Sequence, residues 1–155
     1  MSHRALVAYA RPDGRDDWHL APWGGETDLR DHIKADRPFA GGAVRPERLA
    51  VLPFEEGVAR LDHLLVEAVY RVASDWTVTA FLPVWGDCLG PGPLVELPPA
   101  EGLAALREYA HGARRALCAL VADGVLSLGA GRKRLVGALE ARVGADQVRA
   151  GDAPL

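Results

Sequence analysis

The first two dozen residues constrain the fold more than any later segment. Two runs rich in apolar residues, 4–11 and 15–23, flank a Pro-Asp-Gly tripeptide at 12–14. Glycine tolerates the positive φ that tight turns need, and proline presets the backbone at the entry to such a turn. Because Pro22 has no N–H to donate to a neighbouring strand, the second run should stop pairing there. The segment therefore predicts a β-hairpin over about residues 3–22.

The register of this hairpin sorts its side chains onto two faces. With residues 13–14 as the turn centre, Tyr9 lies opposite Trp18, as an aromatic pair on an apolar face that packs into the core. In that register His3 and His19 point to opposite faces, so they do not share a metal ion. The other face is half polar and is the candidate ligand-binding face, with the chemistry-bearing residues Arg4, Asp17, His19 and Trp23.

Further strands and helices follow from local patterns between residues 24 and 99. Thr27 can cap a short helix. For residues 58–73 two interpretations stay open: a helix to about 67 followed by a strand from 68, which we favour, or one continuous helix. Residues 86–99 are rich in Gly and Pro and predict a surface loop, with at most a short extended piece at 94–97. The expected elements are a helix at 26–36, a strand at 48–54, a helix at 58–67 and a second hairpin at about 68–85.

The C-terminal part of the chain predicts two helices. Apolar residues recur at helical spacing from Leu103 to Val121, and Gly124 suits the position just after a helix end. Ser127 suits the N-cap of the next helix, which Gly144 can close. The expected helical pair covers about 99–123 and 127–143.

Length and composition indicate one globular domain. The chain has 155 residues, of which 49% are hydrophobic and 25% are charged, as is ordinary for a folded protein. We expect an α+β fold in which an antiparallel sheet, built from the two hairpins, packs against helices. Residues 1–150 should form a single domain, followed by a frayed tail at 151–155.

Net charge and cysteine content limit the partners and the cellular location that we expect. The net charge of −3 provides no bulk attraction to nucleic acid or to anionic membranes. Cys88 and Cys118 alone do not make a disulfide framework, and the chain has no leader pattern and no apolar run long enough to span a bilayer. We expect a cytoplasmic, reducing location, no cofactor, no bound metal and no membrane partner. Self-association and a protein partner stay open.

The opening also carries a distinctive motif, His3-Arg4-Ala5-Leu6-Val7-Ala8-Tyr9, followed by Asp13-Gly14, His19 and Trp23-Gly24. In this motif, and in weaker matches at 67–72, 76–81, Trp85 and 123–126, the chain resembles a family of uncharacterised proteins from halophilic archaea. It departs from that pattern at Ser2 and at 21–22, and it is less acidic than a typical halophilic protein. The resemblance implies no assigned activity and carries over no catalytic residue.

Metal chemistry has one candidate cluster. His63 and Glu67 are spaced i, i+4 on the expected helix, and His19 would have to join them as a third ligand. The same spacing is common at the edge of any amphipathic helix. A metal-dependent hydrolase around these three residues is our third hypothesis.

The basic C-terminal helices suggest a second hypothesis, a nucleic-acid-binding regulator. The two helices and the short connection at 124–127 resemble a helix-turn-helix, whose cations contact phosphates and base edges. Solvent-exposed arginines on a helical hairpin explain the same pattern. The candidate nucleic-acid-binding residues are Arg114, Arg115, Arg132, Lys133 and Arg134.

The first hypothesis is a small binding or accessory module without an enzymatic site. The serines and cysteines of the chain lie in no nucleophile motif. The glycine-rich segments of the chain match neither the phosphate loop nor the dinucleotide-binding pattern. No catalytic residue is assigned from the sequence.

Overall fold

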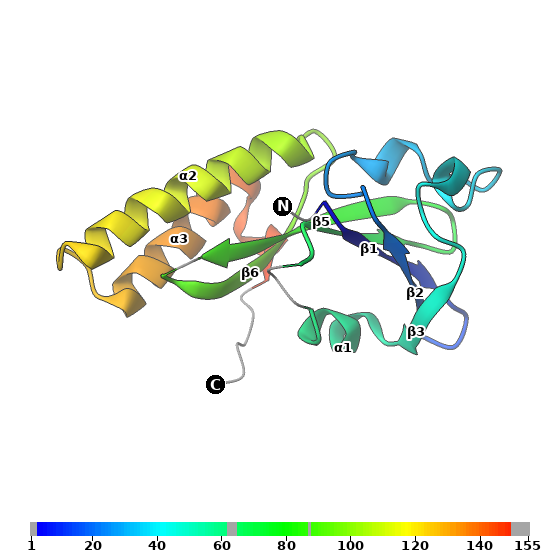
Figure 1. Cartoon of the computed structure of the whole chain (residues 1–155), viewed down its shortest axis with the longest axis horizontal. Helices are drawn as coiled ribbons and strands as arrows, with labels where there is room; N and C mark the ends of the chain where they lie inside the picture. Colours follow the sequence, from blue (N-terminus) through cyan, green and yellow to red (C-terminus); the bar gives the residue numbers. More distant parts are fainter. Residues whose placement is uncertain (1–2, 62–64, 87, 150–155) are drawn as a thin grey trace. The chain divides into compact units, whose positions relative to one another are not determined.

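In the structure, a computed structural model, residues 3–61, 65–86 and 88–149 are described, with the backbone alone for 85, 86 and 91. The strands are hydrogen-bonded in the order β3-β2-β1-β4-β5-β6-β7. β1 and β4 are parallel, and the other pairings described are antiparallel. The predicted α+β fold with a C-terminal helical pair is confirmed (Figure 1).

The chain divides into two compact units, residues 1–81 and 82–155. A single domain over residues 1–150 remains our prediction, and residues 151–155 lie outside the described part of the chain. In unit 1 the strands are β1 (Ala5–Ala10), β2 (Asp16–Ala21), β3 (Arg48–Leu52), β4 (Ala68–Val72) and the first half of β5 (Val78–Gly86). Its helical elements are η1 (Leu29–Asp31), η2 (Ala40–Gly42) and α1 (Phe54–Ala59).

The predicted N-terminal hairpin is present, but its predicted register is wrong by one residue. Tyr9 lies opposite Asp17 and not opposite Trp18. Since successive side chains of a strand point to opposite faces, a slip of one residue moves every side chain of β2 to the other face relative to β1. The prediction that His3 and His19 point to opposite faces depended on that register, so it has lost its basis.

The turn explains the slip. The Arg11 N–H donates to Arg15 O at 2.9 Å, so the loop contains three residues, 12–14. Gly14 has a φ of +82°, which completes a turn that a side chain would strain. Three-residue hairpin loops with a left-handed last residue are common, whereas the predicted register assumed the tighter two-residue loop.

One face of the unit 1 sheet is covered by α1. The Trp18 indole stacks on the Phe54 ring with centroids 5.7 Å apart, and Phe54 also contacts Phe81 at 5.2 Å. Gly57 lies against the same indole, because a Cβ at this position would collide with the Trp18 ring. Trp18 therefore belongs to a buried aromatic layer between the sheet and α1.

The opposite face is covered by the segment 22–47. In Figure 1 this segment lies on one side of β1 and β2, and α1 lies on the other side. The Tyr9 ring contacts the His19 ring at 5.2 Å and the Phe39 ring at 5.7 Å. The Tyr9 hydroxyl donates to Pro38 O at 2.6 Å, and burial raises the pKa of this phenol above its ordinary value. The half-buried Tyr9 and the buried His19 thus hold the segment 22–47 against the sheet.

Two predicted helices in unit 1 are shorter than expected. Within 26–36 only the turn Leu29–Asp31 is helical, and its cap is the Asp28 side chain rather than Thr27. α1 begins at Phe54 rather than at residue 58, because Pro53 suits the residue before a helix and Glu55 and Glu56 complement the helix dipole in the first turn. The strand from Ala68 is confirmed, so one continuous helix over 58–73 is wrong.

Unit 2 confirms the predicted helical pair. Ser127 Oγ accepts a hydrogen bond from the Ala130 N–H at 3.1 Å and caps α3, as expected. No helix among the described residues is both long and apolar enough to cross a membrane. The elements are the remainder of β5, β6 (Gly90–Glu96), α2 (Leu103–Ala122), α3 (Leu128–Val143), η3 (Ala145–Gln147) and β7 (Val148–Arg149).

The predicted loop at 86–99 is wrong, because half of it, Gly90–Glu96, forms β6. β6 pairs with β7, with Val95 opposite Val148. At Gly92 the backbone lies so close to the carbonyl of Val84 that a Cβ would collide with it. Glycine inside a strand often marks such a close backbone approach, so the residue type that suggested a loop here permits a strand.

The two cysteines are joined by a disulfide, which the absence of a disulfide framework in the sequence did not predict. Cys88 follows β5 and Cys118 lies on α2, with Cα atoms 5.8 Å apart and a sequence separation of 30. That distance is typical of disulfides. It arises from the packing of α2 in unit 2, which residue spacing alone does not reveal.

Candidate ligand-binding hollow

A hollow of about 500 Å³ opens on unit 1 beside the start of β1 and the end of β2. Its volume lies within the range of small-ligand sites in proteins. Of the predicted ligand-binding face, Arg4 and Trp23 line this hollow, whereas His19 and Asp17 do not. The described lining residues are His3, Arg4, Leu20, Pro22, Trp23, Arg45 and Leu65.

Cations and a flat ring characterise this lining. Arg4 and Arg45 are both exposed, and the Trp23 side chain is 64% exposed. The His3 ring stacks on the Trp23 indole, with centroids 5.7 Å apart and ring planes at 27°. None of the described lining residues is acidic. The hollow therefore offers guanidinium groups next to an accessible aromatic surface.

The backbone beneath the stacked rings is closely packed. The Gly25 N–H donates to His3 O at 2.7 Å, and the Glu67 N–H donates to Arg4 O at 2.9 Å. A Cβ at Gly25 would lie 2.8 Å from the Glu67 Cβ, so only glycine fits here. Glu67 Oε2 also lies 3.5 Å from His3 Nδ1. The start of β1 is thus held from both sides.

His19 lies behind the hollow rather than in it. Its side chain is only 6% exposed and packs between the Tyr9 and Phe39 rings. His19 Nδ1 lies 2.9 Å from Arg45 O, and since a carbonyl only accepts, the ring nitrogen is the donor. The Arg45 N–H donates in turn to Leu20 O at 2.8 Å. His19 therefore positions a residue that lines the hollow.

Asp17 belongs to a charge network at the far end of the hairpin. Its Oδ1 lies 3.0 Å from Arg11 Nη1 and 3.3 Å from Arg48 Nη1. Close by, hydrogen bonds from Arg15 and then Arg11 hold the pKa of Asp13 well below its usual range. These contacts brace the turn and the sheet edge, and they provide no surface to the hollow.

Asp16 is a buried ionisable group of unit 1. Its side chain is 1% exposed, and burial raises the pKa of its carboxyl above the ordinary value despite the attraction of Arg71. The Arg71 Nε lies 3.3 Å from Asp16 Oδ2 without hydrogen-bond geometry, and among the described residues Oδ2 has no hydrogen-bond partner. The Arg71 guanidinium also lies over the Phe54 ring, so this pair is on the α1 side of the sheet.

Two members of the proposed metal cluster, His19 and Glu67, have other partners. His19 bonds to Arg45 O, Glu67 contacts His3, and His63 lies outside the described residues. Within the described residues, no group of three or more His, Cys, Asp or Glu side chains is arranged to hold a metal ion.

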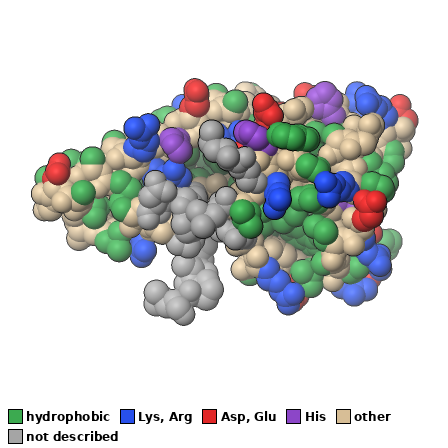
Figure 2. All heavy atoms as spheres, viewed as in Figure 1, with side chains coloured by type: hydrophobic (Ala, Val, Ile, Leu, Met, Phe, Trp, Pro, Cys, Tyr) green, Lys and Arg blue, Asp and Glu red, His purple; other side chains and the backbone are tan. Residues whose placement is uncertain are grey.

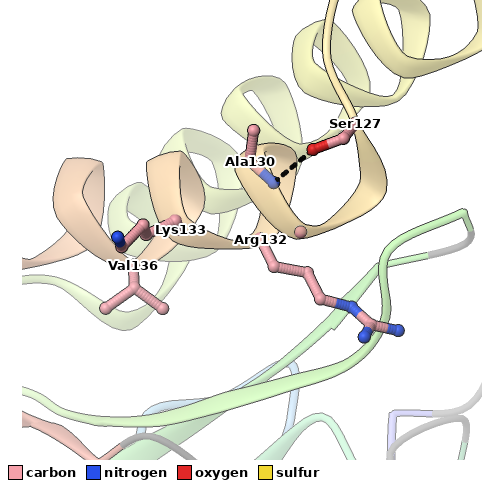
Figure 3. A pocket seen from close by; sticks show the side chains of 6 residues that line it. Ser127, Ala130, Arg132, Lys133 and Val136 are labelled. Atoms are coloured by element: carbon pink, nitrogen blue, oxygen red, sulfur yellow. Dashed lines mark hydrogen bonds between the residues drawn. The ribbon is translucent and has the colours of Figure 1, made fainter.

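Two further hollows lie along α3 in unit 2, and Lys133 lines both. Arg132 extends toward the β5–β6 end, where its Nε donates to Leu89 O at 2.7 Å (Figure 3). One hollow, of about 760 Å³, is lined by Ser127, Gly129, Ala130, Arg132, Lys133 and Val136. The other, of about 600 Å³, is lined by Ala130, Lys133, Arg134 and Gly137.

The other two predicted nucleic-acid residues lie on α2. Arg114 Nη2 lies 3.0 Å from His111 Nδ1, and Arg115 is exposed. On the face in Figure 2, the coloured side chains of Lys and Arg are interspersed with those of Asp and Glu. That face therefore carries no large patch of one sign among the residues drawn in colour.

Sequence reasoning missed Arg45, Leu20, Pro22 and Leu65 as lining residues. Arg45 lies in the segment 22–47, where no periodicity or spacing marks it. Arginine in a loop is a weak signal, although binding residues are often on loops held by a rigid scaffold. His3 was considered only as a metal ligand, and its stacking on Trp23 depends on the geometry beyond the strand ends.

Comparison with known proteins places a family match on the same part of the chain. Neither a curated protein nor a solved structure matches the chain. The matched segment, 1–56, contains β1, β2, β3 and every described lining residue except Leu65. The resemblance to an uncharacterised family is thereby confirmed: over residues 1–56 the chain is similar to a family of unknown function, DUF6735.

Proposed function

We propose that this protein is a non-enzymatic binding module that holds a small anionic ligand in the hollow beside β1 and β2. The observation that carries the proposal is the joint lining by Arg4, Arg45 and the exposed Trp23. Guanidinium groups bind carboxylate and phosphate through two parallel hydrogen bonds, and they do so without deprotonating near neutral pH.

The fastening of this region supports the same conclusion. Arg45 is held at its N–H by Leu20 and at its carbonyl by His19. Arg4 is held at its carbonyl by the Glu67 N–H. A site whose backbone is already ordered loses less conformational entropy when a ligand binds.

The test is a titration of the protein with inorganic phosphate and with acetate, in which backbone amide NMR shifts are recorded at each ligand concentration. We expect saturable shifts at residues 3–4, 20–21, 23 and 45, and their loss in the double variant Arg4→Gln/Arg45→Gln. The matched control is Arg48→Gln, which removes an exposed arginine of the same unit outside the hollow. Shifts of equal size in the double variant would exclude the hollow as the site.

A nucleic-acid-binding regulator that uses α3 is the second candidate function. It is favoured by the exposed run Arg132, Lys133 and Arg134, and by the two hollows that Lys133 lines. The net charge of −3 and the structural hydrogen bond of Arg132 weigh against it.

Duplex DNA binding at two salt concentrations tests this second candidate. Lys133→Gln/Arg134→Gln should weaken binding and flatten its salt dependence, because each lost phosphate contact releases one counterion fewer. Arg132→Gln is unsuitable alone, since it also breaks the bond to Leu89 O. No binding of the wild type at low salt removes the candidate.

The haloarchaeal source, the cytoplasmic location and the metal-dependent hydrolase each need a separate test. A haloarchaeal source predicts a fold that gains stability in molar KCl, which denaturation at graded salt measures. A cytoplasmic location predicts reduced thiols, whereas the Cys88–Cys118 bond is typical of oxidising compartments. The metal-dependent hydrolase around His19, His63 and Glu67 requires a bound metal, so elemental analysis without metal would eliminate it.

A further inference from the structure

The hollow of unit 1 contains more than a pair of cations. Trp23 is 64% exposed, although an indole is among the side chains that gain most from burial. It is also held rather than loose, because the His3 ring stacks on it at 5.7 Å. The exposed Trp23 indole, held in place beside arginines, forms a stacking platform on which a second aromatic ring can lie.

The ring of the platform is supported by unit 1 itself. The His3 carbonyl accepts from the Gly25 N–H at 2.7 Å, and His3 Nδ1 lies 3.5 Å from Glu67 Oε2. Gly24 and Gly25, which follow Trp23, both lie against neighbouring atoms so closely that only glycine fits. The position of the indole is therefore set by the packing of its neighbours.

We propose that the ligand of this hollow is a flat aromatic ring that bears an anionic group, either a phosphate or a carboxylate. The ring stacks on Trp23, and the anion pairs with Arg4 and Arg45, which line the same hollow of about 500 Å³. Apolar Leu20, Pro22 and Leu65 cover the edges of the ring. This inference rests on the proposed function, since it names the ligand class of the same site.

Matched pairs of probes separate the ring from the anion. AMP is compared with ribose 5-phosphate, and benzoate is compared with acetate, by calorimetric titration of the full chain. Because stacking of a base on an aromatic side chain strengthens binding roughly 5- to 150-fold, we expect that gain for at least one ringed probe. The pair that shows the gain identifies phosphate or carboxylate as the anion.

Variants assign the gain to one residue. Trp23→Leu should lower the affinity of the ringed probe to that of its ringless partner and leave the ringless partner unchanged. Trp76→Leu, at another partly exposed tryptophan of the same unit that does not line the hollow, should change neither. Because Trp23 is exposed, its replacement should not prevent folding. Acrylamide quenching of the wild type gives a second measure, since the ringed probe should shield the indole and the ringless one should not.

The outcomes distinguish the two proposals. If no probe binds, or if binding survives in Arg4→Gln/Arg45→Gln, the proposed function fails and this inference with it. If ringed and ringless probes bind equally and both depend on the arginines, the anion site stands and the aromatic ligand is excluded. Unchanged affinity of the ringed probe in Trp23→Leu would exclude it equally.

Discussion

His19 Nδ1 donates to the backbone carbonyl of Arg45 across 2.9 Å. This bond links a buried residue of β2 to a residue that lines the candidate hollow, 26 positions later in the chain. The histidine that the sequence singled out for ligand contact thus acts one layer behind the surface, as a positioning residue.

Replacing His19 should loosen that link. His19→Phe keeps a ring between Tyr9 and Phe39 but removes the donor, and the loss of one intramolecular hydrogen bond costs about 0.5–1.5 kcal/mol. We expect that loss in urea denaturation, together with weaker phosphate or acetate binding. The matched control is Tyr9→Phe, which removes a bond to Pro38 O and leaves Arg45 untouched. Anion affinity in His19→Phe equal to that of the wild type would contradict the positioning role.

Asp16 should make the fold less stable as pH rises. Burial raises the pKa of this carboxyl in the folded state above the ordinary 3.8. The folded protein therefore binds the proton more tightly than the unfolded chain, so stability is greatest below about pH 4 for this group and falls through the folded-state pKa. Compared with Asp16→Asn, the wild type should lose stability over that window and then level off.

The partner of Asp16 provides a second check on the same titration. Arg71→Gln removes the attraction that opposes the effect of burial. The pKa of Asp16 should rise further, which moves the pH window of stability loss upward. Denaturation between about pH 4 and pH 8 measures this shift. A difference between wild type and Asp16→Asn that does not vary with pH would refute both expectations.

The disulfide should contribute strongly to unit 2. A bridge between residues 30 apart removes chain entropy from the unfolded state, which amounts to about 3–4 kcal/mol. We expect reductant to lower the denaturation midpoint of the wild type and to leave Cys88→Ser/Cys118→Ser unchanged. Mass spectrometry after alkylation counts the free thiols. Two alkylated cysteines in the untreated native protein would contradict the bridge.

Two glycine substitutions should have opposite effects. A Cβ at Gly57 would collide with the Trp18 indole, so Gly57→Ala should cost about 1–3 kcal/mol by overpacking. Gly112 lies inside α2, and a Cβ there meets nothing within 4 Å. Gly112→Ala should stabilise the protein by about 0.5–1 kcal/mol, because alanine is the better helix former. Thermal denaturation of the two variants compares them directly, and equal signs would show the Trp18 contact to be wrong.

Local chemistry in the sequence determined which segments become strands and helices in most of this protein. Turn residues and β-branched runs indicated the two hairpins, and the cap at Ser127 indicated α3 correctly, because each depends on neighbours in the chain. Where local patterns conflicted with packing they failed. Gly92 reads as a loop residue, yet its missing side chain is what lets β6 lie against the carbonyl of Val84.

Tertiary structure alone decided the register, the disulfide and the site. A three-residue loop that contains Gly14 shifted β2 by one residue and placed His19 beside Tyr9. Because residues on both faces of β2 are buried, its sequence does not alternate between apolar and polar residues and did not reveal the shift. Arg4, Trp23 and Arg45 come together because the segment 22–47 folds back over β1 and β2. Residue types at the opening predicted a binding face, but the contact between Arg45 and that face depends on closing a long loop, which no local spacing encodes.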